Sequence, residues 1–115
     1  MDRADAPPGA VAPGEVLAKA ASRAAAWLGL SEQELLHALE LQAACDALEA
    51  GSTPWYNALS LIHLAYRLEK LAGSQIAAHQ WLRGPNAGLG RPPIERLLEA
   101  GGASALLDYT HAFYR

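Results

Sequence analysis

The segment from Thr53 to Ala72 constrains the fold more than any other part of this sequence. Thr53 followed by Pro54 is typical of a helix cap and first helical position, and Gly73 is typical of a helix end. The sequence therefore predicts one helix over the whole segment. Its apolar residues cover more than one face, so we expect this helix to be central and largely buried. They are Leu59, Leu61, Ile62, Leu64, Ala65, Tyr66, Leu68 and Leu71.

Further helices are predicted on both sides of this segment. Ala and Leu carry most of the 51% hydrophobic content, which favours helix, and no alternation of period two is long enough for a strand. The sequence therefore predicts an all-α fold, a small helical bundle. The expected helices are 15–28, ended by Gly29; one that begins at the capping box Ser31–Glu34; 74–83; 93–100; and 103 to the C-terminus.

The stretch from Leu30 to Ala50 has the length and leucine spacing of a helix-turn-helix. A break near Glu40 would leave a short helix Gln42–Ala50 in the recognition position, whereas an unbroken pattern would give one long helix, and the sequence leaves both open. Gln42 suits a base edge, but Asp46 and Glu49 would meet phosphates with like charge. We therefore expect a helix-turn-helix-like half in which DNA binding is disfavoured and Gln42 is the candidate DNA contact.

Charge and composition limit the compartment and the partners. The net charge of −3 argues against a general polyanion binder, while the residues after Asn57 are the more basic half, so an acidic ligand would be met there. Residues 1–14 are rich in Pro and Gly and are expected to be a flexible tail. No run approaches the ~18 apolar residues of a membrane span, which together with the single cysteine predicts a cytoplasmic protein without membrane contact.

No group of residues assembles a catalytic, metal or cofactor site, so we expect a protein that is not an enzyme. Cys45 and His37 would lie about 12 Å apart on helical segments, and a packed core thiol is the favoured interpretation of Cys45. Asp108 and His111 lie one turn apart without a nucleophile or oxyanion donors. The four histidines lack metal-ligand spacing.

The Gly-rich loop from Gly84 to Arg91 raises the question of phosphate binding. It lacks the preceding strand and the Lys-Ser/Thr pair of a phosphate-binding loop. Its notable residue is Leu89, which is apolar and stands between two glycines. Either Leu89 plugs the core of this protein or it docks on a partner, and both interpretations stay open.

Leu59 to Asp108 resembles the C-terminal toxin-binding domain of the Xre/MbcA/ParS antitoxin family. The matching pieces are the Leu-rich helix that ends in Glu69-Lys70-Leu71-Ala72-Gly73, then Ala78 and the run WLRGPNAGLGRPPIERLLEAGG, followed by Leu106 and Leu107. The ensemble is fairly specific, although no single residue in it is. Together with the patterns upstream, the resemblance leads us to expect a tail (1–14), a helix-turn-helix-like helical domain (15–72) and a C-terminal toxin-binding domain (73–115).

The resemblance implies a type II antitoxin whose partner is a RES-domain toxin, an enzyme that consumes NAD or uses it for ADP-ribosyl transfer. It implies a hetero-oligomeric complex in which the C-terminal part of the antitoxin occludes the active site of the toxin. A helix-turn-helix autoregulator of its own promoter is the alternative. Aromatic residues and Arg are the usual interface anchors. The candidate toxin-binding residues are Trp81, Arg83, Asn86, Leu89, Arg91, Tyr109, Phe113, Tyr114 and Arg115.

Overall fold

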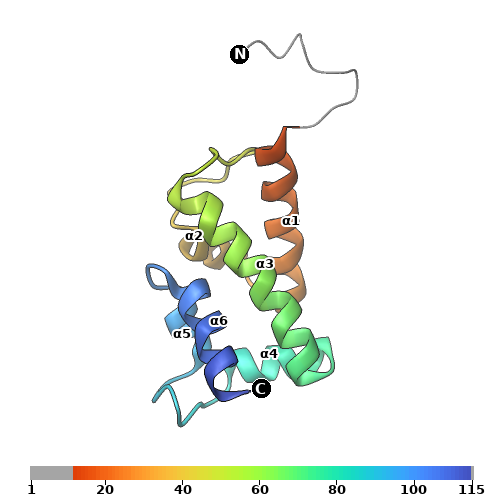
Figure 1. The fold of residues 1–115 in the computed structure, drawn as a ribbon, viewed down its shortest axis with the longest axis vertical. Helices are drawn as coiled ribbons and strands as arrows, with labels where there is room; N and C mark the ends of the chain where they lie inside the picture. Colours follow the sequence, from red (N-terminus) through yellow and green to blue (C-terminus); the bar gives the residue numbers. More distant parts are fainter. Residues whose placement is uncertain (1–11, 115) are drawn as a thin grey trace.

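The computed structural model describes residues 12–114, and these form six α-helices without a strand (Figure 1). The all-helical prediction is confirmed. No helix in this range is long and apolar enough to cross a bilayer. The predicted tail lies mostly outside the described residues. The helices are α1 (Pro13–Leu28), α2 (Glu32–Leu39), α3 (Thr53–Ala72), α4 (Gln75–Arg83), α5 (Pro93–Leu97) and α6 (Gly102–Phe113).

Local caps set most of the helix ends, as the sequence predicts. The Ser31 hydroxyl accepts the Glu34 N–H at 3.1 Å, and the Glu34 carboxylate accepts the Ser31 N–H at 2.9 Å, which is the expected capping box of α2. At α3 the capping hydroxyl is that of Ser52, one residue before the predicted Thr53, and it accepts the N–H of Trp55. Helix α3 then ends at Gly73 as expected, in the left-handed conformation.

The segment between α2 and α3 corrects the helix-turn-helix prediction. Residues 40–52 contain no helix, so neither the short helix Gln42–Ala50 nor one long helix is formed. Glu40 ends α2 with φ of 61°, and it is the only residue other than glycine with positive φ in the range 12–114. Because this conformation turns the chain away from the axis of α2, the helix cannot continue.

Long-range contacts hold Glu40 in that conformation. Its carboxylate accepts a hydrogen bond from the side-chain amide of Asn57 at 2.9 Å and another from the N–H of Gly101 at 3.2 Å. Asn57 is buried and also donates to the carbonyl of Leu39 at 3.0 Å. Glu40 therefore joins the end of α2 to α3 and to the start of α6, contacts that no local pattern contains.

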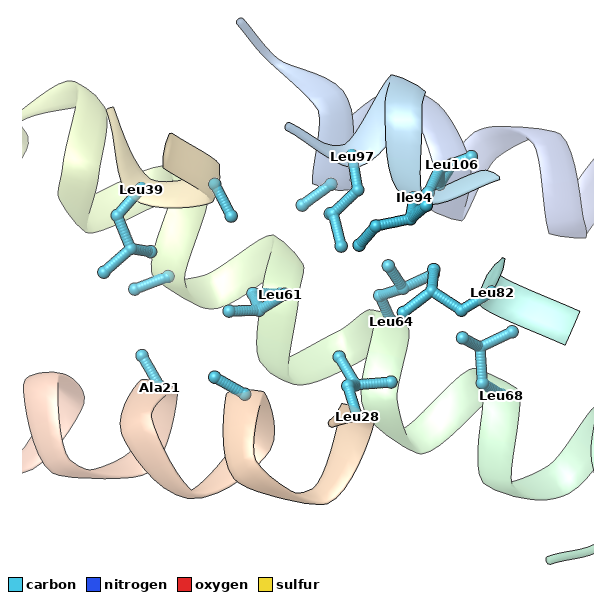
Figure 2. Packing of buried hydrophobic residues seen from close by; sticks show 14 of the residues in the cluster. Ala21, Leu28, Leu39, Leu61, Leu64, Leu68, Leu82, Ile94, Leu97 and Leu106 are labelled. Carbon is cyan, nitrogen blue, oxygen red and sulfur yellow. The ribbon is translucent and has the colours of Figure 1, made fainter. Parts of the chain in front are cut away.

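Helix α3 is central, as predicted, and lies between α1 on one side and α5 and α6 on the other (Figures 1 and 2). Leu61, Leu64 and Leu68 are almost completely buried and belong to one apolar cluster with residues of all six helices. A single cluster thus spans the predicted boundary at residues 72/73, and the division into two domains stays a prediction. Of the apolar residues in the pattern that predicts a largely buried helix, Leu59 and Tyr66 are 37% and 61% exposed.

Helix α4 uses one side to cap the C-terminal end of α1. The side-chain nitrogens of Gln75 and His79 lie 3.0 and 2.6 Å from the carbonyl oxygen of Trp27, and Arg83 donates to the carbonyl of Gly29 at 2.9 Å. Spacing of four residues places the three side chains along one side of α4. Carbonyls that a helix end leaves unpaired are therefore satisfied by another helix.

Arg83 also binds α2. Its guanidinium donates two hydrogen bonds to the Glu34 carboxylate, at 2.7 and 3.1 Å, and these bonds hold the pKa of Glu34 below its ordinary value of 4.5. The bidentate geometry is the stronger form of this pair. Glu34 therefore both caps α2 and ties α2 to α4.

Truncation of Leu64 tests the central packing. We expect Leu64→Ala to lower the free energy of unfolding by about 3 kcal/mol, because the surrounding helices cannot close the cavity. Leu59→Ala removes the same atoms from an exposed position of the same helix and should cost much less. Urea unfolding followed by circular dichroism measures both, and equal losses would contradict a core centred on α3.

The pair Glu34–Arg83 should give a pH-dependent contribution to stability. A carboxyl whose pKa is lowered by folding stabilises the fold above its unfolded pKa, and this stabilisation is lost as the pH falls through the folded pKa. Glu34→Gln keeps a capping-box residue but loses the charge. We expect a loss of roughly 0.5–1 kcal/mol at pH 7 for this partly exposed pair, vanishing as the pH falls well below 4.5.

Glu32→Gln is the matched control, because it removes a negative charge from the same first turn, where the structure shows no ion pair for Glu32 within residues 12–114. Urea titrations of wild type and both variants at several pH values separate the ion pair from the helix-terminus effect. A Glu34→Gln penalty that is independent of pH, or equal to that of Glu32→Gln, would exclude the ion pair as its cause.

Candidate functional site

Four aromatic side chains predicted from separate parts of the sequence meet at the C-terminal end of the described chain. Trp81 of α4 packs edge-on against Tyr114, with ring centroids 6.3 Å apart. Tyr109 contacts Phe113 at 4.8 Å and Tyr114 at 6.1 Å. We call Trp81, Tyr109, Phe113 and Tyr114 the aromatic cluster. Trp81 and Tyr109 are half-buried, whereas Phe113 is 68% and Tyr114 36% exposed, so the cluster presents apolar area to solvent.

Asn86 joins the Gly-rich loop to this cluster. Its side-chain oxygen accepts hydrogen bonds from the N–H of Leu89 at 3.0 Å and from the Tyr109 hydroxyl at 3.1 Å. Burial, and next the neighbouring Tyr114, raise the pKa of the Tyr109 hydroxyl above its ordinary value of 10.0. Gly88 lies so close to the same hydroxyl that a Cβ atom there would overlap it. The loop therefore rests on α6 in one defined conformation.

Leu89 is half-buried and packs against the apolar cluster of the protein. Of the two interpretations that the sequence leaves open, the structure favours the plug of the core. Around it, the loop from Arg83 to Pro92 encloses an open hollow of about 520 Å³ beside Asn86. Leu89 thus anchors the loop to the core, and the outer side of the loop stays accessible to solvent.

Both loop arginines are engaged within the chain. Arg83 binds Glu34 and Gly29, and Arg91 binds both oxygens of the Glu99 carboxylate, at 2.6 and 2.8 Å. These bonds lower the pKa of Glu99. An acidic group on a partner would therefore compete with Glu34 or Glu99 for these guanidiniums.

The remaining candidates lie elsewhere. Arg115 lies outside the described residues, and Gln42 is exposed in the irregular segment 40–52, far along the chain from the cluster. Cys45 is exposed rather than packed in the core, because the helix that would have turned it inward is not formed. Among residues 12–114, no three His, Cys, Asp or Glu side chains gather in a way that could hold a metal ion.

Arg67 of α3 is the residue that sequence reasoning missed. Its guanidinium donates to the carbonyl of Thr110 at 3.1 Å and to that of Tyr114, which lies at the end of the aromatic cluster. Its Nε is buried and has no hydrogen-bond partner among the described residues. A cation that binds the last carbonyls of a helix stabilises that end. Arg67 therefore fixes where α6 stops and where Tyr114 lies.

The signal for Arg67 was weak in the sequence. One arginine in a Leu-rich helix is ordinarily solvated, and its two carbonyl partners follow 43 and 47 residues later. Both partners are backbone carbonyl oxygens, which every residue carries, so no sequence motif could predict these hydrogen bonds. The contact becomes visible once α6 is known to pack against α3.

Removal of the Arg67 guanidinium should release the end of α6. We expect Arg67→Met to keep the apolar stem packed, to lower the free energy of unfolding by about 1–3 kcal/mol, and to shift the NMR signals of Tyr114 and of the Trp81 indole N–H. Lys70→Met, an exposed cation one turn along α3, is the control and should leave these signals in place. Unchanged signals in Arg67→Met would contradict the anchoring role.

Comparison with protein families identifies part of the chain. Residues 67–110 match the antitoxin Xre/MbcA/ParS C-terminal toxin-binding domain, and the resemblance noted from the sequence is confirmed. A search of curated proteins gives no match. The matched range begins at Arg67, includes Trp81, Asn86 and Tyr109, and ends just before the exposed rings of the cluster. Over residues 67–110 the chain is therefore similar to the C-terminal toxin-binding domain of the Xre/MbcA/ParS antitoxins.

Proposed function

We propose that this protein is an antitoxin that neutralises a cognate toxin by direct binding, and that the toxin is a RES-domain enzyme that consumes NAD. The match of residues 67–110 to a toxin-binding domain carries the proposal. The exposed aromatic cluster at the end of that domain supports it, because aromatic rings are the commonest anchors of protein interfaces. The proposed mechanism is occlusion of the active site of the toxin.

The exposed rings suit insertion into a cleft. Phe113 and Tyr114 stand at the end of α6, and an aromatic side chain that becomes buried removes roughly 150–250 Å² from water. Arg67 and Trp81 hold this end in place before any partner arrives. A surface that is already ordered loses little conformational entropy on binding. The cluster is therefore suited to fill the mouth of an active site and exclude substrate.

The hollow beside Asn86 and the ion pairs around it suit the rim of the same interface. The ion pairs Arg83–Glu34 and Arg91–Glu99 place both signs of charge at this hollow, which Arg83 and Arg91 line. Interfaces commonly combine an apolar centre with a polar rim. We assign Arg83, Asn86 and Arg91 to this rim, with Phe113 and Tyr114 at the centre and Arg115 following them.

Promoter binding through a helix-turn-helix has no comparable support. A recognition helix must enter the major groove, and the described residues between α2 and α3 contain no helix. The exposed acidic residues Asp46 and Glu49 in this segment would also face the phosphates.

The proposed activity is tested by reconstitution with the protein encoded in the adjacent reading frame. Expressed without this chain, that protein should arrest growth and lower cellular NAD. Purified, it should consume NAD, and addition of this chain should stop the reaction at a fixed molar ratio. An adjacent protein that consumes no NAD would refute the RES assignment, and NAD consumption that continues in a stable complex would refute occlusion.

Truncation of the most exposed ring tests the surface. We expect Phe113→Ala to weaken inhibition at least tenfold, because a central aromatic anchor contributes about 2 kcal/mol or more to binding. Its fold should change little, since the ring is 68% exposed. Tyr56→Ala removes a similarly exposed ring from the opposite end of α3 and should inhibit like wild type. Equal inhibition by Phe113→Ala and wild type would remove Phe113 from the interface.

A further inference from the structure

The two arginines that line the hollow beside Asn86 are held in different ways, and Arg83 is the more firmly held of the two. Its guanidinium binds the Glu34 carboxylate at 2.7 and 3.1 Å and also the carbonyl oxygen of Gly29 at 2.9 Å. The Glu34 side chain is only 21% exposed, and the same carboxylate caps α2. Displacement of Glu34 would therefore break the contacts that join α4 to α1 and α2, so this pair is part of the fold.

Arg91 is held by one side chain. Its guanidinium donates two hydrogen bonds to the Glu99 carboxylate, at 2.6 and 2.8 Å, and within residues 12–114 it binds no other group. The side chains of Arg91 and Glu99 are 36% and 47% exposed, so water reaches both charges. Exposed ion pairs contribute little to stability. Exchange of Glu99 for another carboxylate would therefore cost the fold little.

Glu99 also has a second cation beside it. The Nη1 atom of Arg96 lies 3.4 Å from the same Glu99 oxygen, Oε1, that accepts one of the two bonds from Arg91. Arg96 is held in place by a hydrogen bond to the carbonyl oxygen of Ala100 at 3.2 Å. A charge that loses its partner is costly only where water and other charges cannot replace that partner. Glu99 released from Arg91 would keep both water and Arg96.

We propose that Arg91 exchanges partners when the toxin binds: an acidic side chain of the toxin takes the place of Glu99, which is its competitor in the free chain. This inference rests on the proposed function and adds the chemistry of the partner residue. The planar guanidinium matches both oxygens of a carboxylate, and Glu99 already occupies it in this way. Arg91 also lines the open hollow of about 520 Å³, which gives a side chain of the toxin room to approach.

The charges around Arg91 set the sign of the expected effect. The hydrogen bonds from Glu99 raise the pKa of Arg91, and the negative charges of Glu99 and Glu95 act in the same direction. These acidic groups also weaken the attraction that a carboxylate of the toxin meets at Arg91. If Glu99 competes with the toxin, loss of its charge should strengthen the complex. If Glu99 only oriented Arg91 for the toxin, the same change should weaken the complex.

Isothermal titration calorimetry of the full chain with the protein encoded in the adjacent reading frame tests the proposal. Glu99→Gln should lower the dissociation constant about two- to fivefold, because an exposed competitor is weakened. Arg91→Met should raise it at least tenfold. The double variant R91M/E99Q should bind like Arg91→Met, because the gain requires the guanidinium. Glu69→Gln removes the same charge from an exposed residue without an ion pair in the described range and should bind like wild type.

Several results would overturn the exchange. Unchanged or weaker binding by Glu99→Gln would show that Glu99 does not compete, and an equal gain in Glu69→Gln would assign the effect to net charge. A gain that persists in R91M/E99Q would place the competition away from Arg91. In each of these cases wild type still binds, so the proposed function stands and only this inference fails. A wild-type chain that does not bind the adjacent protein would contradict the proposed function and this inference with it.

Discussion

The burial of α3 on two opposite sides is the constraint on which the rest of this structure depends. Leu61, Leu64 and Leu68 exclude water between α1 and the pair α5–α6, and every other helix is placed by contact with α3 or with a helix that packs on it. The same helix carries Arg67, whose guanidinium holds the end of α6. The position of the exposed aromatic rings thus follows from the packing of a helix at the centre of the molecule.

Polar contacts join the family-matched segment 67–110 to the N-terminal half at two further points. Glu40 accepts a hydrogen bond from Gly101, and Arg83 binds Glu34 and Gly29. Helix α4 is thereby fixed to the ends of α1 and α2. Residues 67–110 therefore depend for their placement on contacts with the rest of the chain, although only they match the family.

The helices could be predicted from the sequence where their ends are decided by neighbouring residues. Ser31, Ser74 and Gly73 act within one turn of where they stand, so their roles were visible in the pattern. Residues 40–52 could not be predicted, because Glu40 adopts a left-handed conformation that depends on residues 17 and 61 positions away. The exposure of Tyr66 was missed for a related reason. An apolar pattern shows that a face avoids water and does not show whether this chain or another covers it.

The candidate site was predictable in its side chains and not in its supports. The resemblance indicated Trp81 and Asn86, the preference of interfaces for aromatic residues added the C-terminal rings, and these residues meet in the structure. The internal ion pairs of Arg83 and Arg91 and the anchor at Arg67 required the tertiary structure. Hydrogen exchange of this chain, free and bound to the proposed toxin, tests the central claim most directly. If the aromatic cluster occludes the active site of the toxin, the backbone amides of residues 84–92 and 109–114 should exchange more slowly in the complex than in the free chain. Protection confined to α1 and α2, with these segments exchanging as in the free chain, would contradict it.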